Sequence, residues 1–339
     1  MTVVKFSRVV VTGGAGFIGS NYVRYALKHH PEWEIVVLDK LTYAGNLENL
    51  ANVLERITFV HGDIANPDDV ARALDGADAV VNFAAESHVD RSLMDPRPFI
   101  RTNVEGTLVL LEGARRFGVK RFLHVSTDEV YGDTSGSDRL SKETDRFAPR
   151  SPYSASKAAA EHLVTSYWVS YGLDVVVTRG SNTYGPYQYP EKIIPLFITN
   201  VMEGKPVPVY GRGTAVRDYM YVEDHCSGID MVLHHGKGGE AYNLGARMEV
   251  PGIEVAQRIL RLMGQSEDLI QFVPDRPGHD YRYAVDPSKA EALGWKRTWT
   301  WEEGLAKTVE WYKENEGWWR RVKEKMHFRQ YEAAWYASR

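Results

Sequence analysis

The stretch Arg8-Val-Val-Val-Thr12-Gly13-Gly14-Ala15-Gly16-Phe17-Ile18-Gly19 establishes the architecture that we expect. Its apolar part is too short for a signal peptide, and it runs directly into glycines at positions 13, 16 and 19. Glycine permits a tight turn and lets the backbone N–H groups at a helix N-terminus approach a pyrophosphate. The stretch therefore predicts a first strand over residues 8–12 and a dinucleotide-binding turn that opens a helix.

The rest of the first half alternates short β-rich runs with segments of helical periodicity. We expect strands over 34–39, 57–62, 79–84, 121–126 and 174–179, and helices over 21–30, 67–74 and 101–117. Ser151 as N-cap and Pro152 as first helical residue predict a further helix that runs to about Tyr171. Strands that are apolar throughout are typical of a parallel sheet covered on both faces. The predicted fold is α/β, a Rossmann-type doubly wound parallel sheet with a smaller C-terminal substrate-binding α+β domain.

The pattern changes after Arg179, which indicates a second domain. Gly, Pro and Tyr are frequent over 181–210, where we expect mainly loops, and seven of the nine tryptophans lie beyond residue 290. A helix over 222–235 and a strand over 241–245 would return to the first sheet. We therefore expect a cofactor domain of residues 1–181 and 220–246, and a substrate domain of residues 182–219 and 247–339.

Composition excludes several classes of function. The 339 residues are 43% hydrophobic and 25% charged, as in ordinary globular proteins. A net charge of −4 argues against nucleic-acid binding, and no apolar run reaches the roughly 18 residues of a membrane span. A single cysteine, Cys226, fits a reducing compartment, so we expect a cytoplasmic protein. The segment Trp318-Trp-Arg-Arg-Val-Lys-Glu-Lys325 is interpreted as a packing helix with a charged face.

Acidic residues at two predicted strand ends indicate which dinucleotide binds. Asp39 closes the second strand twenty residues after Gly19, where a carboxylate binds the adenosine ribose hydroxyls. Such a carboxylate repels the 2′-phosphate of NADP, so the sequence favours NAD. Lys40 follows directly, and its positive charge would favour the 2′-phosphate instead. Asp63 and Ile64 would border the adenine, unless Asp63 only caps a turn.

The candidate chemistry lies in Val125-Ser-Thr127-Asp128-Glu129-Val-Tyr-Gly132 and Tyr153-Ser-Ala-Ser-Lys157. Tyr153 and Lys157 are four residues apart and share one helix face. A phenol with a pKa of about 10 is a poor base at neutral pH, but a neighbouring ammonium and a bound nicotinamide cation would lower that value. Asp128 and Glu129 cannot both ionise cheaply, so one pKa should rise, which supplies an acid and a base beside the Tyr–Lys pair and suggests that oxidation is one step of a longer reaction.

In its glycine turn and its Tyr-x-x-x-Lys pair the chain resembles the extended short-chain dehydrogenase/reductase family. Residues 126–132 are similar to the dTDP-glucose 4,6-dehydratases of that family. The similarity spans nearly the whole chain, through Ala84-Ala-Glu-Ser-His-Val-Asp-Arg-Ser92, Ser181-Asn-Thr-Tyr-Gly-Pro-Tyr187, Pro190-Glu-Lys192, Arg217-Asp218, Tyr221-Val-Glu-Asp224 and Asp275-Arg-Pro-Gly-His-Asp280. Thr183 and Gln188 depart from the group's pattern, in which Asn and His are usual, and these positions bear on the substrate pocket.

The resemblance implies conversion of dTDP-glucose to a 4-keto-6-deoxy sugar with tightly bound NAD, a step of deoxysugar biosynthesis such as that of dTDP-rhamnose. Tyr153 would take the C4 hydroxyl proton while NAD accepts the C4 hydride, and Thr127 would hydrogen-bond the C4 oxygen. Glu129 would then remove the C5 hydrogen as Asp128 protonates the departing C6 hydroxyl. The hydride would finally return to C6.

The resemblance also assigns ligand-binding residues. The cofactor set is Gly13, Gly16, Phe17, Ile18, Gly19, Asp39, Lys40, Thr42, Asp63, Ile64, Ala84, Tyr153 and Lys157. The substrate set is Ser87, His88, Asn182, Glu191, Lys192, Tyr210, Arg217, Asn243, Arg276 and His279. Within it, Arg217, Arg276 and His279 would surround the diphosphate and Tyr210 would stack on the pyrimidine, whereas Arg217 could instead pair with Asp218. Relatives often dimerise through two helices, so we expect a homodimer through the regions 101–117 and 151–171.

No metal is expected, because His29-His30 and His234-His235 lack the spacing of metal ligands and are interpreted as surface residues at helix ends.

Other functions stay open. A UDP-glucose 4,6-dehydratase would carry similar catalytic residues. A 4-epimerase needs no acid–base pair at C5 and C6, and a UDP-glucuronate decarboxylase must bind a carboxylate that Asp128 would repel. A dinucleotide sensor without catalysis would not need Asp128, Glu129, Tyr153 and Lys157.

Overall fold

A parallel sheet forms the larger part of the protein. The structure is a computed structural model that describes residues 5–275, 278–325, 328–331 and 333. Among these residues, seven strands pair in the order β10-β6-β5-β4-β1-β2-β3, all parallel. They are β1 (Arg8–Thr12), β2 (Glu34–Asp39), β3 (Ile57–His61), β4 (Ala79–Asn82), β5 (Arg121–Thr127), β6 (Val175–Gly180) and β10 (Ala241–Leu244). The order reverses between β1 and β4, where ligands of open α/β sheets bind outside the carboxyl ends of the strands.

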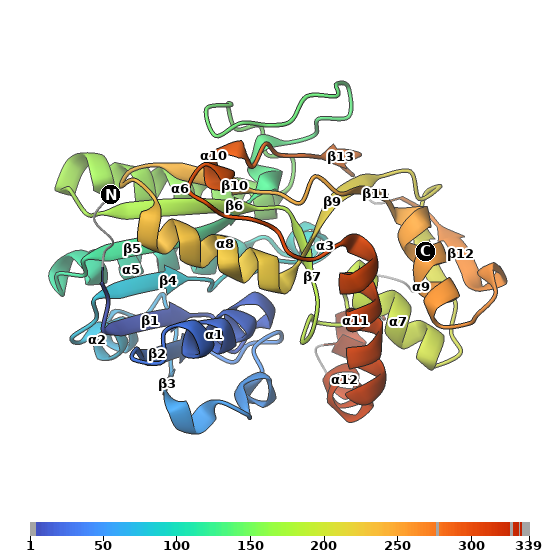
Figure 1. The fold of residues 1–339 in the computed structure, drawn as a ribbon, viewed down its shortest axis with the longest axis horizontal. Coiled ribbons are helices and arrows are strands. Elements are labelled where there is room, and N and C mark those ends of the chain that lie inside the picture. The colour runs from blue at the N-terminus through green and yellow to red at the C-terminus, as the bar shows by residue number, and fades with distance from the viewer. Residues whose placement is uncertain (1–4, 276–277, 326–327, 332, 334–339) are drawn as a thin grey trace.

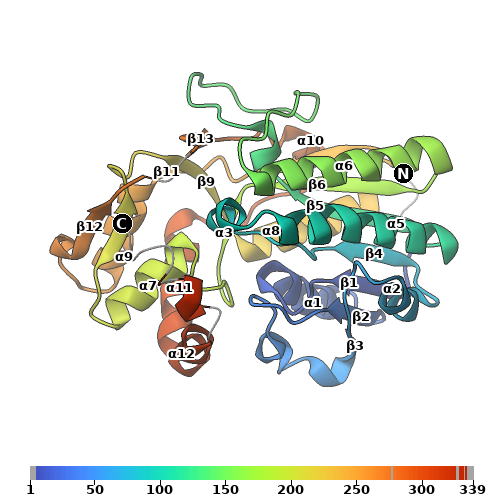
Figure 2. The same ribbon diagram turned by 180° about the vertical axis from the view of Figure 1, so that it is seen from behind.

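Helices cover both faces of this sheet (Figures 1 and 2). Helices α1 (Phe17–His29) and α8 (Val222–His235) cover one face, and α2 (Pro67–Leu74), α5 (Gly106–Arg116) and α6 (Pro152–Tyr171) cover the other. Successive side chains of a strand point to opposite faces, so Val9 and Val11 enter the core under α1 and α8, whereas Val10 enters the core under α2, α5 and α6. The predicted doubly wound sheet is confirmed.

A smaller lobe lies beside the sheet, on the right in Figure 1. Its strands β7 (Asn182–Tyr184), β11 (Glu249–Pro251) and β13 (Arg282–Tyr283) pair with β9 (Val216–Tyr221), and β8 (Val207–Tyr210) pairs with β12 (Ile270–Val273). Its helices are α7 (Ile193–Met202), α9 (Gly252–Leu262), α11 (Trp301–Glu314) and α12 (Glu316–Glu324). Trp301 and Trp319 are among the largest side chains buried in its core. Because Trp318 and Trp319 are buried, α12 is a packing helix, as its sequence predicts.

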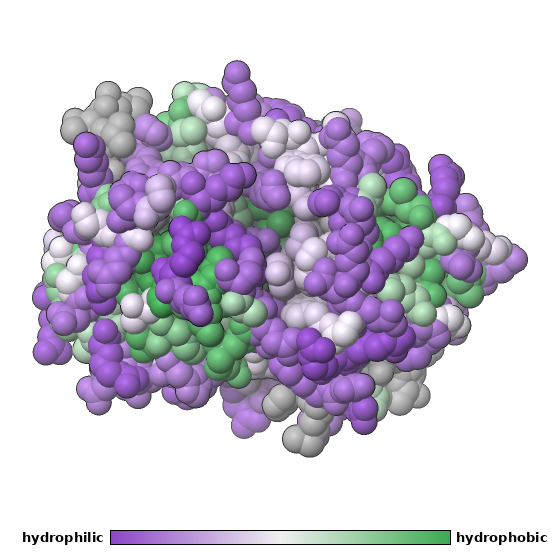
Figure 3. Space-filling view, turned by 60° about the horizontal axis from the view of Figure 1, so that its bottom comes forward, coloured by the Kyte–Doolittle hydropathy of each residue, from purple (hydrophilic) through white to green (hydrophobic). Residues whose placement is uncertain are grey.

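Short elements complete the fold. They are the helices α3 (Val89–Met94), α4 (Arg97–Phe99) and α10 (Ser288–Glu291), a π-helical turn at Ile100–Glu105, and 3₁₀ turns at Leu47–Leu50, Leu54–Arg56, Asp128–Tyr131 and Glu267–Leu269. Among the described residues, no helix is long and apolar enough to span a membrane. On the face drawn in Figure 3, hydrophilic residues predominate and hydrophobic residues gather in separate patches.

Four expectations from the sequence need correction. Helix α1 begins at Phe17 rather than at residue 21, and the region 101–117 opens with a π-helical turn before α5. The segment 181–210, expected to be mainly loops, contains β7, α7 and β8. Helix α7 is apolar around most of its circumference and almost wholly buried, so it has no amphipathic pattern. His30 and His234, expected at the surface, have side chains only 18% and 12% exposed.

Candidate active site

A cavity of about 290 Å³ opens at the carboxyl ends of β1 and β4, and every residue of the predicted cofactor set lines it. Gly13 has φ +66°, and a Cβ there would lie 2.6 Å from the Ala84 nitrogen. A Cβ on Gly19 would collide with the Gly13 carbonyl oxygen. These two positions need glycine because the turn packs directly on the end of β4 and the first turn of α1 packs directly on the glycine turn.

Acidic residues line the far end of this cavity. The Asp39 carboxylate accepts hydrogen bonds from the backbone N–H groups of Ala15 (2.9 Å) and Leu41 (2.8 Å). Burial raises the pKa of Asp39, and the two N–H groups oppose that rise. Asp63 accepts a hydrogen bond from the Ala65 N–H (2.9 Å) and forms an ion pair with Lys40 (2.8 Å). Asp63 therefore both caps a turn and borders the cavity, and Lys40 is engaged by this carboxylate.

The candidate catalytic residues meet at the other end of the cavity. Thr127 ends β5, and Asp128 and Glu129 begin the 3₁₀ turn that follows it. The Thr127 hydroxyl donates to the Asp128 carboxylate (3.2 Å) and accepts from the Glu129 N–H (3.2 Å). The Lys157 ammonium donates to the Val125 carbonyl (2.7 Å). Together with Tyr153, these side chains form one wall of the cavity.

Burial and neighbouring charges separate the acid–base properties of these groups. Burial, followed by the charges of Glu129 and Asp218, raises the pKa of Asp128 well above its ordinary value. This shift favours the protonated form of Asp128, so that its carboxyl group can act as a proton donor. Burial lowers the pKa of Lys157 to about 8, and Glu161 opposes that shift. Burial and Glu129 raise the pKa of the Tyr153 phenol, so the positive charges of Lys157 and of a nicotinamide ring are needed for it to act as a base.

Several buried polar atoms in the cavity wall have no hydrogen-bond partner within the described part of the chain. They are Ser126 Oγ, Asp128 Oδ2, Ser181 Oγ, Asn182 Oδ1, Gln188 Oε1, Tyr189 Oη and His225 Nε2. A buried polar atom without a partner costs free energy, so native structures nearly always provide one. The cavity therefore fits a ligand that carries many polar groups, such as a dinucleotide together with a sugar.

A second cavity of about 170 Å³ adjoins the first and shares Glu129, Asn182, Glu191 and Lys192 with it. Its wall contains His88, Tyr210, Arg217 and His279 from the predicted substrate set, whereas Ser87 lines the first cavity. Lys192 donates to the Ser87 carbonyl (2.9 Å). The cationic and aromatic side chains of the second cavity, such as Arg217 and Tyr210, are typical of a site that binds a nucleoside diphosphate.

Asp90, which lies in the segment 84–92, is buried beside this second cavity. Its carboxylate accepts hydrogen bonds from the hydroxyls of Tyr210 (3.1 Å) and Tyr331 (3.2 Å). Tyr331 lies near the C-terminus and Tyr210 on β8, so one carboxylate joins three distant parts of the chain. Asp90 therefore orients Tyr210 in the cavity wall.

Two expectations about the substrate set need correction. Asn243 is fully buried outside both cavities, where its side chain accepts from the Tyr131 hydroxyl (2.8 Å) and donates to the Ser141 carbonyl (2.9 Å). The resemblance implied a contact with the substrate, but this internal network uses the Asn243 amide. Arg276 lies outside the described residues.

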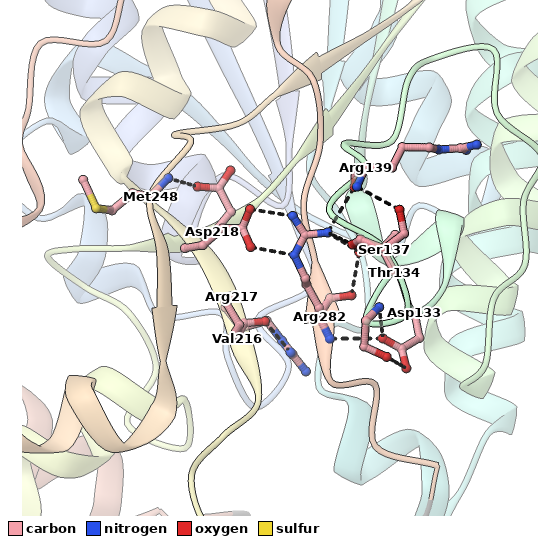
Figure 4. Close-up of polar contacts among 11 residues, drawn as sticks. Asp133, Thr134, Ser137, Arg139, Val216, Arg217, Asp218, Met248 and Arg282 are labelled. Carbon is pink, nitrogen blue, oxygen red and sulfur yellow. Dashed lines mark hydrogen bonds and ion pairs between the residues drawn. The ribbon is translucent and has the colours of Figure 1, made fainter.

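The alternative ion pair of Arg217 with Asp218 is also absent from the described structure (Figure 4). Arg217 donates to the Asp280 carbonyl (2.7 Å), and the Asp218 carboxylate accepts from the N–H groups of Ala246 and Met248. Successive strand residues point to opposite faces, which separates the two side chains.

Reasoning from sequence also missed members of the wall. Glu86 and Tyr43 line the first cavity, and burial raises the pKa of Glu86. Arg91 forms an ion pair with Glu191 (2.8 Å) and lies over the rings of Tyr43 (4.1 Å) and Tyr331 (4.6 Å). Glu86 and Arg91 both lie in the segment 84–92, which carries part of the resemblance. That segment was the only indication in the sequence that these two residues belong to the site.

Fold and cavity wall together define the class of protein: an extended short-chain dehydrogenase/reductase with an additional acid–base pair. The family model described as GDP-mannose 4,6 dehydratase matches residues 10–308. The dTDP-glucose 4,6-dehydratase of Streptomyces niveus is 49% identical over 323 residues, which cover 93% of this chain and 96% of that protein. The chain belongs to the nucleotide-sugar 4,6-dehydratases of this family, in the branch of the dTDP-glucose 4,6-dehydratases.

Solved structures agree with this assignment. DesIV, the dTDP-glucose 4,6-dehydratase of Streptomyces venezuelae with NAD and TYD bound, has a TM-score of 0.91 and 48% identity, over 93% of this chain and 100% of that one. The UDP-glucose 4-epimerase of Thermus thermophilus in complex with NAD has a TM-score of 0.85 and 35% identity, over 91% and 99% of the two chains. The fold is therefore shared with epimerases and does not by itself distinguish the two reactions.

Proposed function

We propose that this protein is an NAD-dependent dTDP-glucose 4,6-dehydratase, which converts dTDP-glucose to dTDP-4-keto-6-deoxyglucose. The observation that carries the proposal is the single wall formed by Tyr153, Lys157, Asp128 and Glu129. A 4-epimerase needs only an oxidising pair such as Tyr153 and Lys157. Loss of water needs a separate proton donor and acceptor as well, and Asp128 and Glu129 supply them.

The first cavity would hold NAD. Its glycine turn would meet the pyrophosphate, Asp39 the adenosine ribose, and Lys157 the nicotinamide end. When bound, NAD would accept a hydride from C4 of the sugar and later return it to C6. The unpaired polar atoms of the cavity wall support the fit.

The chain's own residues would carry the proton transfers. Tyr153 takes the proton of the C4 hydroxyl, while Thr127 holds the same oxygen by a hydrogen bond and Lys157 stabilises the phenolate. The ketone that forms at C4 acidifies the C5–H bond. Glu129 removes the C5 proton, and Asp128 donates its proton to the C6 hydroxyl, so that one water leaves across C5–C6. When the hydride is added at C6, C5 must regain a proton, which the protonated Glu129 can donate.

The second cavity would bind the nucleoside diphosphate. Arg217 would supply positive charge for the diphosphate and His279 a ring N–H, and Tyr210 offers a ring for the pyrimidine. Glu129, Asn182, Glu191 and Lys192 line both cavities, so the sugar would lie where the cavities meet. The hexose thereby reaches the acid–base pair while its nucleotide stays in the smaller lobe.

Product analysis tests the proposal. We would incubate the purified protein separately with dTDP-glucose, UDP-glucose and GDP-mannose and identify each product by mass spectrometry and NMR. The expected result is a 4-keto-6-deoxy product, lighter by one water, formed fastest from dTDP-glucose. Faster turnover of UDP-glucose would correct the nucleotide preference, an isomeric product would indicate an epimerase, and unchanged substrates would favour a sensor.

We also propose that the chain divides into a cofactor domain of 1–181 and 220–246 and a substrate domain of 182–219 and 247–339. A cytoplasmic location is proposed because the lone, buried Cys226 fits a reducing compartment.

Apolar side chains exposed on α5, α6 and the π-helical turn that precedes α5, such as Ile100 (53%) and Val169 (75%), support a homodimer through this face. Sedimentation equilibrium should give twice the chain mass, and a monomer would contradict the dimer.

A further inference from the structure

A cluster of two histidines and one carboxylate lies apart from both cavities, between α1 and α8. We propose that His30, Asp230 and His234 form a binding site for a divalent transition metal such as Zn²⁺. One ligand atom from each residue can be chosen so that all three lie within 4.8 Å of one another. The His30 Nε2 atom lies 2.9 Å from Asp230 Oδ1, and the His234 Nε2 atom lies 3.8 Å from that oxygen.

These separations suit a tetrahedral ion. Zinc binds imidazole nitrogen and carboxylate oxygen at about 2.0–2.2 Å, so two ligand atoms of a tetrahedral site lie roughly 3.3–3.5 Å apart. The separations of 2.9 and 3.8 Å lie on either side of that value, and all three ligand atoms lie within 4.8 Å of one another, so binding an ion requires the side chains to adjust. Three protein ligands leave one position for water. Imidazole ligands favour Zn²⁺ or Co²⁺ over Mg²⁺ and Ca²⁺, which prefer oxygen.

Rigid elements hold the three ligands in place. Asp230 and His234 are four residues apart on α8 and therefore share one helix face. His30 is the C-cap of α1, where its N–H donates to the Ala26 carbonyl. Both helices pack on the same sheet face through one apolar core. A metal here would join the end of α1 to α8.

The surroundings restrict the rings further. The Trp33 ring stacks on His30 with centroids 4.0 Å apart, and the Phe6 ring lies 5.5 Å from that of His234. The Tyr22 hydroxyl lies 3.5 Å from Asp230 Oδ1, as an outer-shell hydrogen bond that orients the carboxylate. These contacts lower the entropy that the ligands would lose on binding an ion. The sequence spacing of the histidines did not indicate this site, because His30 and Asp230 are 200 residues apart in the chain.

The competing explanation is that His30 and Asp230 form only an ion pair between two helices. An ion pair needs no third ligand, whereas a metal site needs His234. Metal binding should therefore be lost in both His30→Gln and His234→Gln. His235→Gln is the matched control, since His235 neighbours His234 on α8 without belonging to the cluster.

We would titrate Zn²⁺ and Mg²⁺ into the full-length protein without a polyhistidine tag, by equilibrium dialysis and thermal unfolding. The expected result is one Zn²⁺ per chain and a Tm rise of about 2–4 °C with Zn²⁺ alone, in wild type and His235→Gln. His30→Gln and His234→Gln should bind Zn²⁺ at least about tenfold more weakly. In wild type, Co²⁺ should show the visible absorption of tetrahedral coordination, a readout that does not depend on any variant folding.

Three outcomes would overturn the site. They are the absence of stoichiometric Zn²⁺ binding to wild type, binding that survives in either histidine variant, and an octahedral Co²⁺ spectrum. A Tm that falls on adding Zn²⁺ would also count against it, because the ion would then prefer the unfolded chain. Catalytic turnover is not the readout, so failure here leaves the proposed dehydratase function untouched.

Discussion

Asp128 and Glu129 are adjacent in sequence but differ in their surroundings. Asp128 is buried, and its pKa is raised, whereas Glu129 is partly exposed and lines both cavities. Two carboxyl groups in different environments divide into an acid and a base. We predicted that one pKa of this adjacent pair would rise. Burial explains why Asp128 is the residue with the raised pKa, which supports its proposed role as the proton donor.

The role of Glu129 is tested by Glu129→Gln. The amide cannot remove the C5 proton, so oxidation at C4 should still occur while elimination slows by about 100-fold or more. Single-turnover measurements should show reduced nicotinamide building up without loss of water from the sugar. The exposed variant Glu310→Gln on α11 is the control and should turn over like wild type. Wild-type turnover in Glu129→Gln would remove this residue from the mechanism.

Asp128→Asn should stabilise the protein while it abolishes product formation. Burial and neighbouring charge raise the pKa of Asp128 in the folded protein above its unfolded value. The folded state then keeps a proton that the unfolded chain releases, so this group's contribution to stability falls as pH rises from about 4 toward the raised pKa.

The stability gain of Asp128→Asn should therefore grow with pH and reach roughly 1–2 kcal/mol near neutrality. Thermal unfolding at about pH 5 and about pH 7.5 checks the sign. Asp138→Asn, in an exposed loop, should show no such trend. If the stability gain of Asp128→Asn instead became smaller as pH rises, the pKa of Asp128 would not be raised in the folded protein.

Helix α6 shows how a local signal positions a catalytic group. The Ser151 hydroxyl accepts from the Ser154 N–H (3.1 Å), and the Ser154 hydroxyl accepts from the Ser151 N–H (3.1 Å), which forms a capping box. Tyr153 is the second residue of this helix, so the cap holds the phenol as well as the helix end. Sequence predicted this helix start because N-capping is a local interaction.

Ser151→Ala should therefore cost both stability and rate. Loss of the cap lowers the free energy of unfolding by about 1 kcal/mol, and displacement of Tyr153 lowers kcat about tenfold or more. Thr300→Ala is the matched control, because Thr300 and Glu303 form the same capping box on α11 outside both cavities. It should lose a similar stability with kcat unchanged, as chemical denaturation and steady-state kinetics would show. An equal loss of kcat in both variants would contradict the positioning role.

Helix α7 marks the limit of local signals. Its run Ile-Ile-Pro-Leu-Phe-Ile is apolar at successive positions, so neither a period of 3.6 nor one of 2 stands out. Only the surrounding lobe, which buries nearly every side chain of this helix, selects the helical conformation. Short strands buried on both faces were predictable from their apolar runs, but this helix, buried on nearly all sides, was not.

The arrangement of the two lobes brings distant segments to one site. Parallel strands with their carboxyl ends at one edge made the cofactor wall predictable from sequence, since the topology itself places β1, β2, β4 and β5 there. The pairing of Arg91 with Glu191, the anchoring of Tyr210 by Asp90 and the internal use of Asn243 were not predictable. Each depends on a contact between segments about 100 residues apart or more, which no spacing rule describes.

A single cavity that oxidises C4 and reduces C6 of the same sugar makes an isotopic prediction. dTDP-glucose with deuterium at C4 should be mixed with dTDP-glucose that carries ¹³C in the ring and no deuterium, and the products analysed by mass spectrometry and NMR. We expect the deuterium at C6 of the molecules that began with it, and none in the ¹³C-labelled product. Hydrogen from solvent at C6, or deuterium crossing to the ¹³C-labelled sugar, would contradict the mechanism.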